Sequence, residues 1–114
     1  MSGPLLDRID LRVAVPRVPP EELLAGPAGE PSTVVAARIE VARRRAILRS
    51  GVINGRLTGS ALLDACALDE PARRMLSQTA SAKGMTARGI HRALRVARTI
   101  ADLDASETID PPHI

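Results

Sequence analysis

The chain contains no phenylalanine, tryptophan or tyrosine, although 45% of its 114 residues are hydrophobic. Alanine, leucine, isoleucine and valine must therefore supply most of the core, and Ala- and Leu-rich helices pack such side chains most easily. Without aromatic side chains, the protein cannot bind its partners through base-stacking platforms, aromatic cages or Tyr and Trp anchors. It also argues against an immunoglobulin-like sandwich, whose core usually holds a Trp or a tyrosine corner. We expect a mainly α-helical protein built as a small helical bundle.

The formal net charge is +3, and Lys83 is the only lysine, so almost all of the positive charge is arginine. Arginine is suited to bidentate contacts with phosphate and carboxylate groups. A net charge of this size does not by itself establish nucleic-acid binding.

Cysteine and histidine are too scarce to build a disulfide framework or a zinc site. Cys66 is the only cysteine and lies in the apolar run 61–68, where a buried structural thiol is expected. His91 and His113 are the only histidines, so zinc is not expected. Because neither a signal peptide nor a membrane-spanning run is visible, we expect a cytoplasmic protein without a membrane partner.

The first 31 residues divide into two segments. In residues 1–15 the apolar side chains alternate with other residues from Ile9 to Val15, as in a strand. A lone strand is unstable, so this segment is either loose or pairs with something outside the chain. Residues 16–31 are rich in proline and glycine and are predicted to be a linker with a short helical turn at 21–25.

A helix is predicted from Ser32, as its N-cap, to about Ser50, with Gly51 just past its end. One stripe of this helix is apolar and consists of Val35, Ile39, Ala42 and Ala46.

Two shorter helices follow. The first is predicted over residues 60–67, started by Thr58 or Ser60. Asp69 is expected to cap the second, which ends at Gly84.

The last long helix is predicted over residues 87–103 with Thr86 as its cap. Its apolar face consists of Ile90, Ala93, Leu94, Val96, Ala97, Ile100 and Ala101. Its other face carries Arg88, His91, Arg92, Arg95, Arg98 and Asp102. That face is either an ordinary solvated basic surface or a surface that meets phosphate, and the pattern alone does not choose between them.

Two long strings resemble one protein family. SGPLLDRIDL at 2–11 and ARGIHRALRVARTIADL at 87–103 are similar to the magnesium-chelatase-related AAA+ ATPases of the bacterial YifB/ComM type. Arg43, Asn54 and the stretch 62–68 fit that family's C-terminal domain. The resemblance covers nearly the whole chain and is weakest in the proline-rich segment.

The resemblance implies roles for two arginines. Arg8 matches the arginine finger, which would reach the γ-phosphate bound in a neighbouring subunit and stabilise charge on the transferring phosphoryl group. Arg88 matches the sensor-2 arginine, which contacts nucleotide from the start of the last lid helix. The alternatives are a salt bridge of Arg8 with Asp7 or Asp10, and a solvated first-turn position for Arg88. For Arg92, Arg95 and Arg98 we expect ion pairs within or between subunits.

The resemblance also implies that important parts lie elsewhere. The chain has no phosphate loop and no Mg²⁺-binding acidic pair, which are expected upstream of Met1. The family continues into a further helix after the 109–113 segment, so residues 106–114 are interpreted as a tail with a truncated final helix. Residues 1–15 would end the α/β core, 16–31 would link it to the lid, and 32–105 would form the helical lid.

The implied function is therefore that of a lid and sensor-2 domain, which supports ATP binding, hydrolysis and ring assembly in a parent protein. The parent would use ATP and Mg²⁺, form a homo-oligomeric ring, a hexamer by the resemblance, and remodel DNA. The chain alone is expected to bind no cofactor tightly and to have no ATPase activity. The alternatives are a stand-alone basic helical nucleic-acid-binding module and, with less support, true chelatase chemistry.

Overall fold

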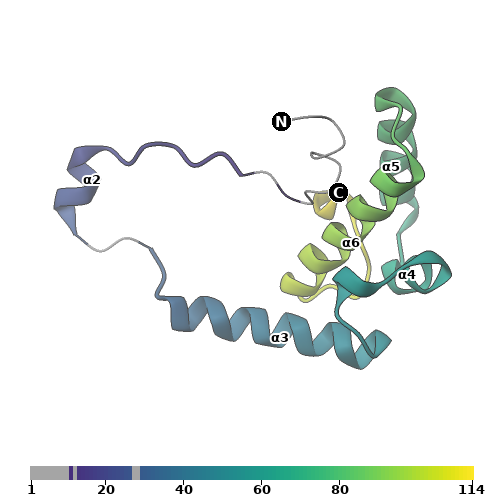
Figure 1. The fold of residues 1–114 in the computed structure, drawn as a ribbon, viewed down its shortest axis with the longest axis horizontal. Coiled ribbons are helices and arrows are strands. Elements are labelled where there is room, and N and C mark those ends of the chain that lie inside the picture. Colours follow the sequence, from purple (N-terminus) through teal and green to yellow (C-terminus); the bar gives the residue numbers. More distant parts are fainter. Residues whose placement is uncertain (1–10, 12, 27–28) are drawn as a thin grey trace.

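The computed structural model describes residues 11, 13–26 and 29–114, and this part of the chain forms helices without a strand (Figure 1). The prediction of a mainly α-helical small bundle is confirmed. Leu11, Val13 and Val15, which belong to the strand-like pattern, are exposed and lie outside any regular element. The rest of that pattern lies outside the described residues.

The proline-rich segment contains one short helix. Helix α2 spans Pro20–Ala25, close to the predicted turn at 21–25, and buries none of its residues. In Figure 1 it lies at the far end of an arm that extends away from the other helices.

Helix α3 spans Ser32–Ser50, as predicted, but Ser32 is its first helical residue and not its cap. Pro31 occupies the N-cap position, where no side chain caps the helix. At the other end Gly51 has a φ of 78° and donates its N–H to the carbonyl of Ile47. Only a residue without a Cβ adopts this left-handed conformation at little cost, so the glycine ends the helix as expected.

Three further helices form the rest of the bundle. They are α4 (Gly59–Cys66), α5 (Glu70–Lys83) and α6 (Ala87–Leu103). The side chain of Asp69 accepts a hydrogen bond from Ala72 N–H, and that of Thr86 accepts one from Gly89 N–H. Both predicted N-caps of α5 and α6 are therefore confirmed. Thr58 is the N-cap residue of α4, without a side-chain capping bond.

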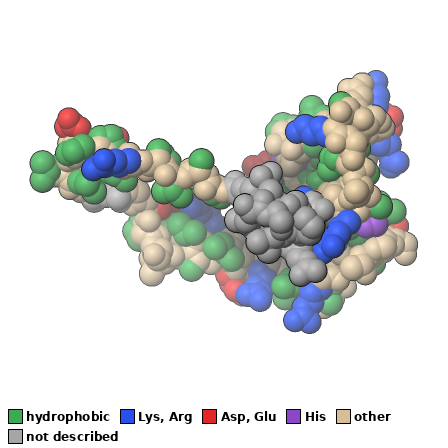
Figure 2. Space-filling view, turned by 45° about the horizontal axis from the view of Figure 1, so that its top comes forward, with side chains coloured by type: hydrophobic (Ala, Val, Ile, Leu, Met, Phe, Trp, Pro, Cys, Tyr) green, Lys and Arg blue, Asp and Glu red, His purple; other side chains and the backbone are tan. Residues whose placement is uncertain are grey.

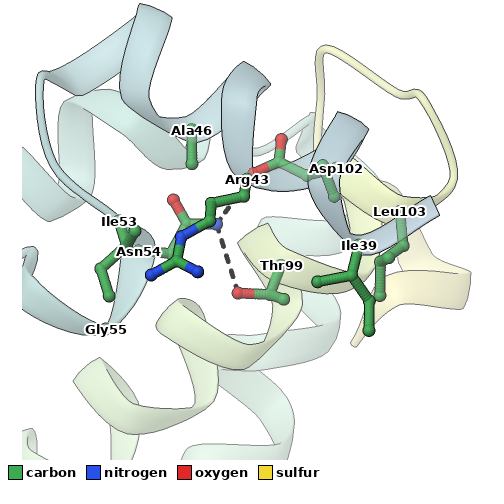
Figure 3. Close-up of a pocket in the computed structure, with 10 residues that line it drawn as sticks. Ile39, Arg43, Ala46, Ile53, Asn54, Gly55, Thr99, Asp102 and Leu103 are labelled. Atoms are coloured by element: carbon green, nitrogen blue, oxygen red, sulfur yellow. Dashed lines mark hydrogen bonds between the residues drawn. The ribbon is translucent and has the colours of Figure 1, made fainter. Parts of the chain in front are cut away.

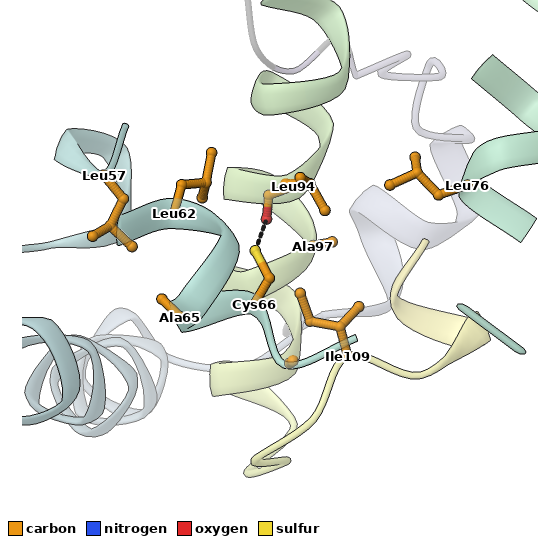
Figure 4. Close-up of a cluster of buried hydrophobic side chains, with 9 residues drawn as sticks. Leu57, Leu62, Ala65, Cys66, Leu76, Leu94, Ala97 and Ile109 are labelled. Carbon is orange, nitrogen blue, oxygen red and sulfur yellow. Dashed lines mark hydrogen bonds between the residues drawn. The ribbon is translucent and has the colours of Figure 1, made fainter. Parts of the chain in front are cut away.

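The hydrophobic core surrounds α6 (Figure 4). Leu94, Ala97 and Ala101 of α6 pack with side chains from α4, α5 and the C-terminal segment. The cluster consists of Leu57, Leu62, Ala65, Cys66, Leu76, Leu94, Ala97, Ala101 and Ile109. It is wholly aliphatic apart from the thiol, as the composition requires.

The C-terminal segment is part of this core. Ile109 is fully buried, and its backbone forms a single parallel bridge with Leu68. The 3₁₀ helix η2 (Pro111–His113) follows and packs against α5 and α6. None of the helices in the described ranges is both long and apolar enough to cross a membrane.

Helix α3 packs on α6 through a narrow strip. Its buried residues are Ala42 and Ala46, both small enough to bring the two helices close together. Ile39, on the same predicted stripe, remains 52% exposed. The N-terminal half of α3 projects beyond α6 (Figure 1), which explains why the stripe is only partly covered.

Candidate functional site

Arg88 lies in the first turn of α6, directly after the Thr86 cap. Its side chain is exposed and forms no ion pair or hydrogen bond with the residues that the structure describes. The N–H groups of a helix's first turn and the helix dipole favour an anion at this position. Arg88 is therefore placed where it could meet a phosphate group approaching the α5–α6 turn. Arg8, the other predicted site residue, lies outside the described residues.

The predicted polar face of α6 is not a continuous solvated surface. Arg98 is fully buried and Asp102 is only 2% exposed, so the prediction is wrong for these two residues. Arg95 is half-buried and donates a hydrogen bond to the carbonyl oxygen of Leu57 at 3.4 Å. Ile100, which was assigned to the apolar face, is 41% exposed. Helical periodicity separates the apolar face of α6 from its polar face. It does not show that α3, α4 and the C-terminal segment cover part of the polar face as well.

The guanidinium of Arg98 joins α4 to the C-terminal segment. It donates to the carbonyls of Ala65 and Cys66, at 3.2 and 3.4 Å, where the last turn of α4 leaves carbonyls without helical partners. It also donates to the carbonyls of Ser106 and Glu107 at 2.6 and 2.9 Å. One buried cation thus caps a helix and holds the segment that follows α6.

Asp102 supplies the negative charge for this cluster. It lies 3.2 Å from Arg98, one turn away on α6, and confirms the expected intradomain ion pair for that arginine. Arg49, near the end of α3, contacts both carboxylate oxygens. Asn54, in η1 (Asn54–Arg56), donates its amide N–H to Asp102 at 2.8 Å and to the Thr99 hydroxyl at 3.2 Å. Asp102 therefore connects α6 to α3 and η1.

Two titratable groups in this cluster have shifted pKa values. Burial lowers the pKa of Arg98, and the neighbouring Arg49 lowers it further, while Asp102 opposes the shift. Burial raises the pKa of the Cys66 thiol from 9.0 to about 11, against the opposing effects of Arg98 and Arg49. Cys66 is fully buried, as predicted for a structural thiol, and its sulfur lies 3.8 Å from the Leu94 carbonyl oxygen.

A pocket of about 290 Å³ lies between α3, η1 and α6 (Figure 3). Its walls are mostly apolar, and they include Ile39, Ile53 and Leu103. The side chain of Arg43 extends across Asn54 at one side of the pocket. Within the described ranges, Arg43 forms no ion pair or hydrogen bond. Asn54 Oδ1 is buried without a hydrogen-bond partner there.

Metal ligation finds no support in the described residues, which contain no cluster of three or more His, Cys, Asp or Glu side chains able to hold an ion. Arginines are the positively charged side chains that this region holds at defined positions. Arg88 and Arg43 are exposed, and Arg49 and Arg98 are used in packing.

No local pattern indicates the Arg49–Asp102 contact, because its two residues are 53 positions apart. The i, i+4 spacing of Arg98 and Asp102 could have indicated their ion pair. The sequence pattern does not indicate that this pair is buried, because helical periodicity places both residues on the polar face of the helix.

Comparisons with known proteins agree on one family. The family model described as magnesium chelatase, subunit ChlI C-terminal, matches residues 29–114. The competence protein ComM of Haemophilus influenzae is 36% identical over 115 residues, which cover all of this chain and 23% of ComM. The YifB proteins of Salmonella typhimurium and Escherichia coli are 37% and 36% identical over 116 residues, again covering all of this chain and 23% of each relative. The chain thus spans less than a quarter of the length of these relatives.

Replacing Asp102 with Asn should destabilise the bundle strongly. The change keeps the shape of the side chain but leaves the buried Arg98 guanidinium without a negative partner, which is expected to lower the free energy of unfolding by about 3 kcal/mol. Urea denaturation measures this loss. The control is Arg38→Ala, which breaks an ion pair with Glu30 whose side chains are 57% and 53% exposed and should change stability by less than about 1 kcal/mol. Equal effects of the two substitutions would show that Asp102 does not hold the cluster.

The raised pKa of Cys66 predicts a loss of stability in alkali. Because the folded state retains the thiol proton more strongly, the stabilisation is complete below pH 9 and is lost as the pH rises through about 11. The free energy of unfolding should fall by about 3 kcal/mol over this range, since each pKa unit corresponds to about 1.4 kcal/mol. Cys66→Ala should lower stability at neutral pH but remove this alkaline decline. The chain has no tyrosine and a single, exposed lysine, and Arg98, whose pKa burial lowers, is present in both proteins, so the difference between the two profiles reports on Cys66. Parallel pH profiles for the two proteins would contradict the assignment.

Proposed function

Because the chain belongs to the family of magnesium chelatase subunit ChlI C-terminal domains, we propose that it is the lid and nucleotide-sensing domain of a longer AAA+ ATPase. The observation that carries the proposal is the position of Arg88. Its side chain is exposed in the first turn of α6, whereas Asp102, near the other end of the same helix, is buried in ion pairs.

In this proposal Arg88 contacts a phosphate group of ATP bound to the rest of the longer protein. Its guanidinium offers several N–H donors in a fixed plane, which suits a phosphate better than a point charge does. The Thr86 cap fixes the start of α6, so the arginine projects from an ordered first turn. ATP, when bound, supplies the transferable phosphoryl group.

The buried cluster would connect this sensor to the rest of the lid. Arg98 and Asp102 join α6 to α3, α4 and the C-terminal segment, so a force on Arg88 would move the lid as one body. A lid of this kind can report whether nucleotide is bound by changing its orientation.

Further parts of the proposal rest on the family resemblance alone. Arg8 would act as an arginine finger toward a neighbouring subunit, and the longer protein would bind Mg²⁺ through residues outside this chain. It would assemble into a homo-oligomeric ring, such as a hexamer, act on DNA and reside in the cytoplasm. A stand-alone nucleic-acid-binding role has less support, because Arg98 is buried and Arg95 bonds to a backbone carbonyl.

Arg88→Ala in the longer protein should reduce ATP turnover by about 10²-fold, as expected for removal of one donor from a charge-stabilising site. Arg8→Ala should reduce it by about 10³-fold or more, as expected for an arginine finger. Steady-state phosphate release by the purified longer protein measures both effects. The isolated 114-residue chain should show no turnover under the same conditions.

The matched control is Arg74→Ala, which removes an exposed arginine from α5. Its turnover should equal that of the unsubstituted protein. Unchanged turnover in Arg88→Ala would remove the sensor role, and unchanged turnover in Arg8→Ala would remove the finger role.

A further inference from the structure

Helix α2 presents apolar and acidic side chains that no other described residue of its chain buries. Leu23 and Leu24 are 69% and 88% exposed, and the helix has no buried residue. Glu21 and Glu22 occupy its first turn. At helical spacing Pro20, Leu23 and Leu24 share one side, flanked by the glutamates. In Figure 2 hydrophobic and acidic side chains lie together at the end of the projecting arm, with a basic side chain beside them.

The pocket beneath Arg43 has the complementary character. Ile39 and Leu103 lie side by side in its apolar wall (Figure 3) and are 52% and 51% exposed. The pocket volume of about 290 Å³ is enough for two leucine side chains.

The charge around this pocket is positive. Among the described residues Asp102 is the only acidic one that lines it, and this residue is 2% exposed and already paired with Arg49 and Arg98. Arg49 and Arg98 together carry two positive charges and Asp102 carries one negative charge, so this cluster beside the pocket has a net positive charge. Arg43 adds an exposed cation at its side, without an ion pair in the described ranges.

We propose that α2 of one copy of this chain docks into the α3–η1–α6 pocket of a second copy. Leu23 and Leu24 fill the apolar hollow, and the glutamates of the first turn pair with Arg43. Docking buries side chains that otherwise remain exposed on both surfaces, and the opposite charges set the orientation. The contact is independent of nucleotide and goes beyond the proposed sensor role.

The arm favours a second copy over its own bundle. Figure 1 shows α2 standing well away from α4, α5 and α6. Pro27 and Pro31 lie in the short connection to α3, and Pro31 has an extended conformation with φ −61° and ψ 149°. The prolines favour an extended connection, whereas Gly26 and Gly29 within it permit bends, so a second copy is chosen on the extended position of α2 and on the opposite charges, and the single-chain variant below tests the alternative.

The contact is small, since α2 has only six residues. Interfaces that bury less than about 1,200 Å² are typical of weak and transient complexes. A covalent trap at about 0.5 mM protein is therefore a better test than a measurement of mass at low concentration.

The test uses single-cysteine substitutions in the full chain, where the native Cys66 is fully buried. Ala25→Cys labels the arm, and Gly55→Cys labels the pocket, because a Cβ at Gly55 meets nothing within 4 Å. Leu48→Cys is the control partner, since Leu48 is 81% exposed on α3 and does not line the pocket. Chains with distinct affinity tags are mixed in pairs under mild oxidation, and the rate of heterodimer disulfide formation is measured.

The arm–pocket pair should cross-link about tenfold faster than the arm–control pair, as expected for a contact assisted by opposite charges. Arg43→Glu on the pocket chain should reduce the rate to the control value. Adding Glu21→Arg and Glu22→Arg on the arm chain should restore it.

Two results would overturn the inference. One is an equal cross-linking rate for the pocket and control positions. The other is an Ala25→Cys, Gly55→Cys double variant that closes within a single chain at a rate independent of concentration, which would place the arm on its own bundle.

Discussion

The bundle depends on a buried pair of opposite charges, Arg98 and Asp102, near the end of α6. An aliphatic core of this size leaves few large side chains to join the helices, and the cluster in Figure 4 contains no ring. The ion pair supplies the connections instead. Arg98 reaches the end of α4 and the C-terminal segment, while Asp102 reaches α3 and η1. Removing either charge would leave the other unpaired in a low-dielectric interior, so each charge depends on the other.

This arrangement separates the two ends of α6. The C-terminal end is used for packing, and its arginine and aspartate are unavailable to a ligand. The N-terminal end is capped by Thr86 and leaves Arg88 exposed. A helix that is fixed at one end and carries a free cation at the other can couple a bound anion to the orientation of a domain. The proposed sensor role uses this geometry.

Local signals in the sequence located the helices well. Gly51, Asp69, Gly84 and Thr86 all occupy the terminal positions expected of them, because caps depend on residues only a few positions apart. Ser32 does not cap α3, because an N-cap residue precedes the first helical residue and Ser32 is itself the first residue of the helix. The position of Arg88 followed from the Thr86 cap and the family resemblance. The pocket beneath Arg43 could not be predicted, since its walls come from three separate elements.

The sequence by itself determined the secondary structure, the aliphatic character of the core and the family of this chain. Each of these depends on composition, on neighbouring residues or on long matching strings. Only the tertiary structure decided which charges are buried. Arg88 and Arg98 look alike on a helical projection of α6, yet one is exposed and the other fully enclosed. The difference arises because α3, the end of α4 and residues 106–107 converge around Arg98 and Asp102, and that convergence depends mostly on contacts between residues far apart in the chain.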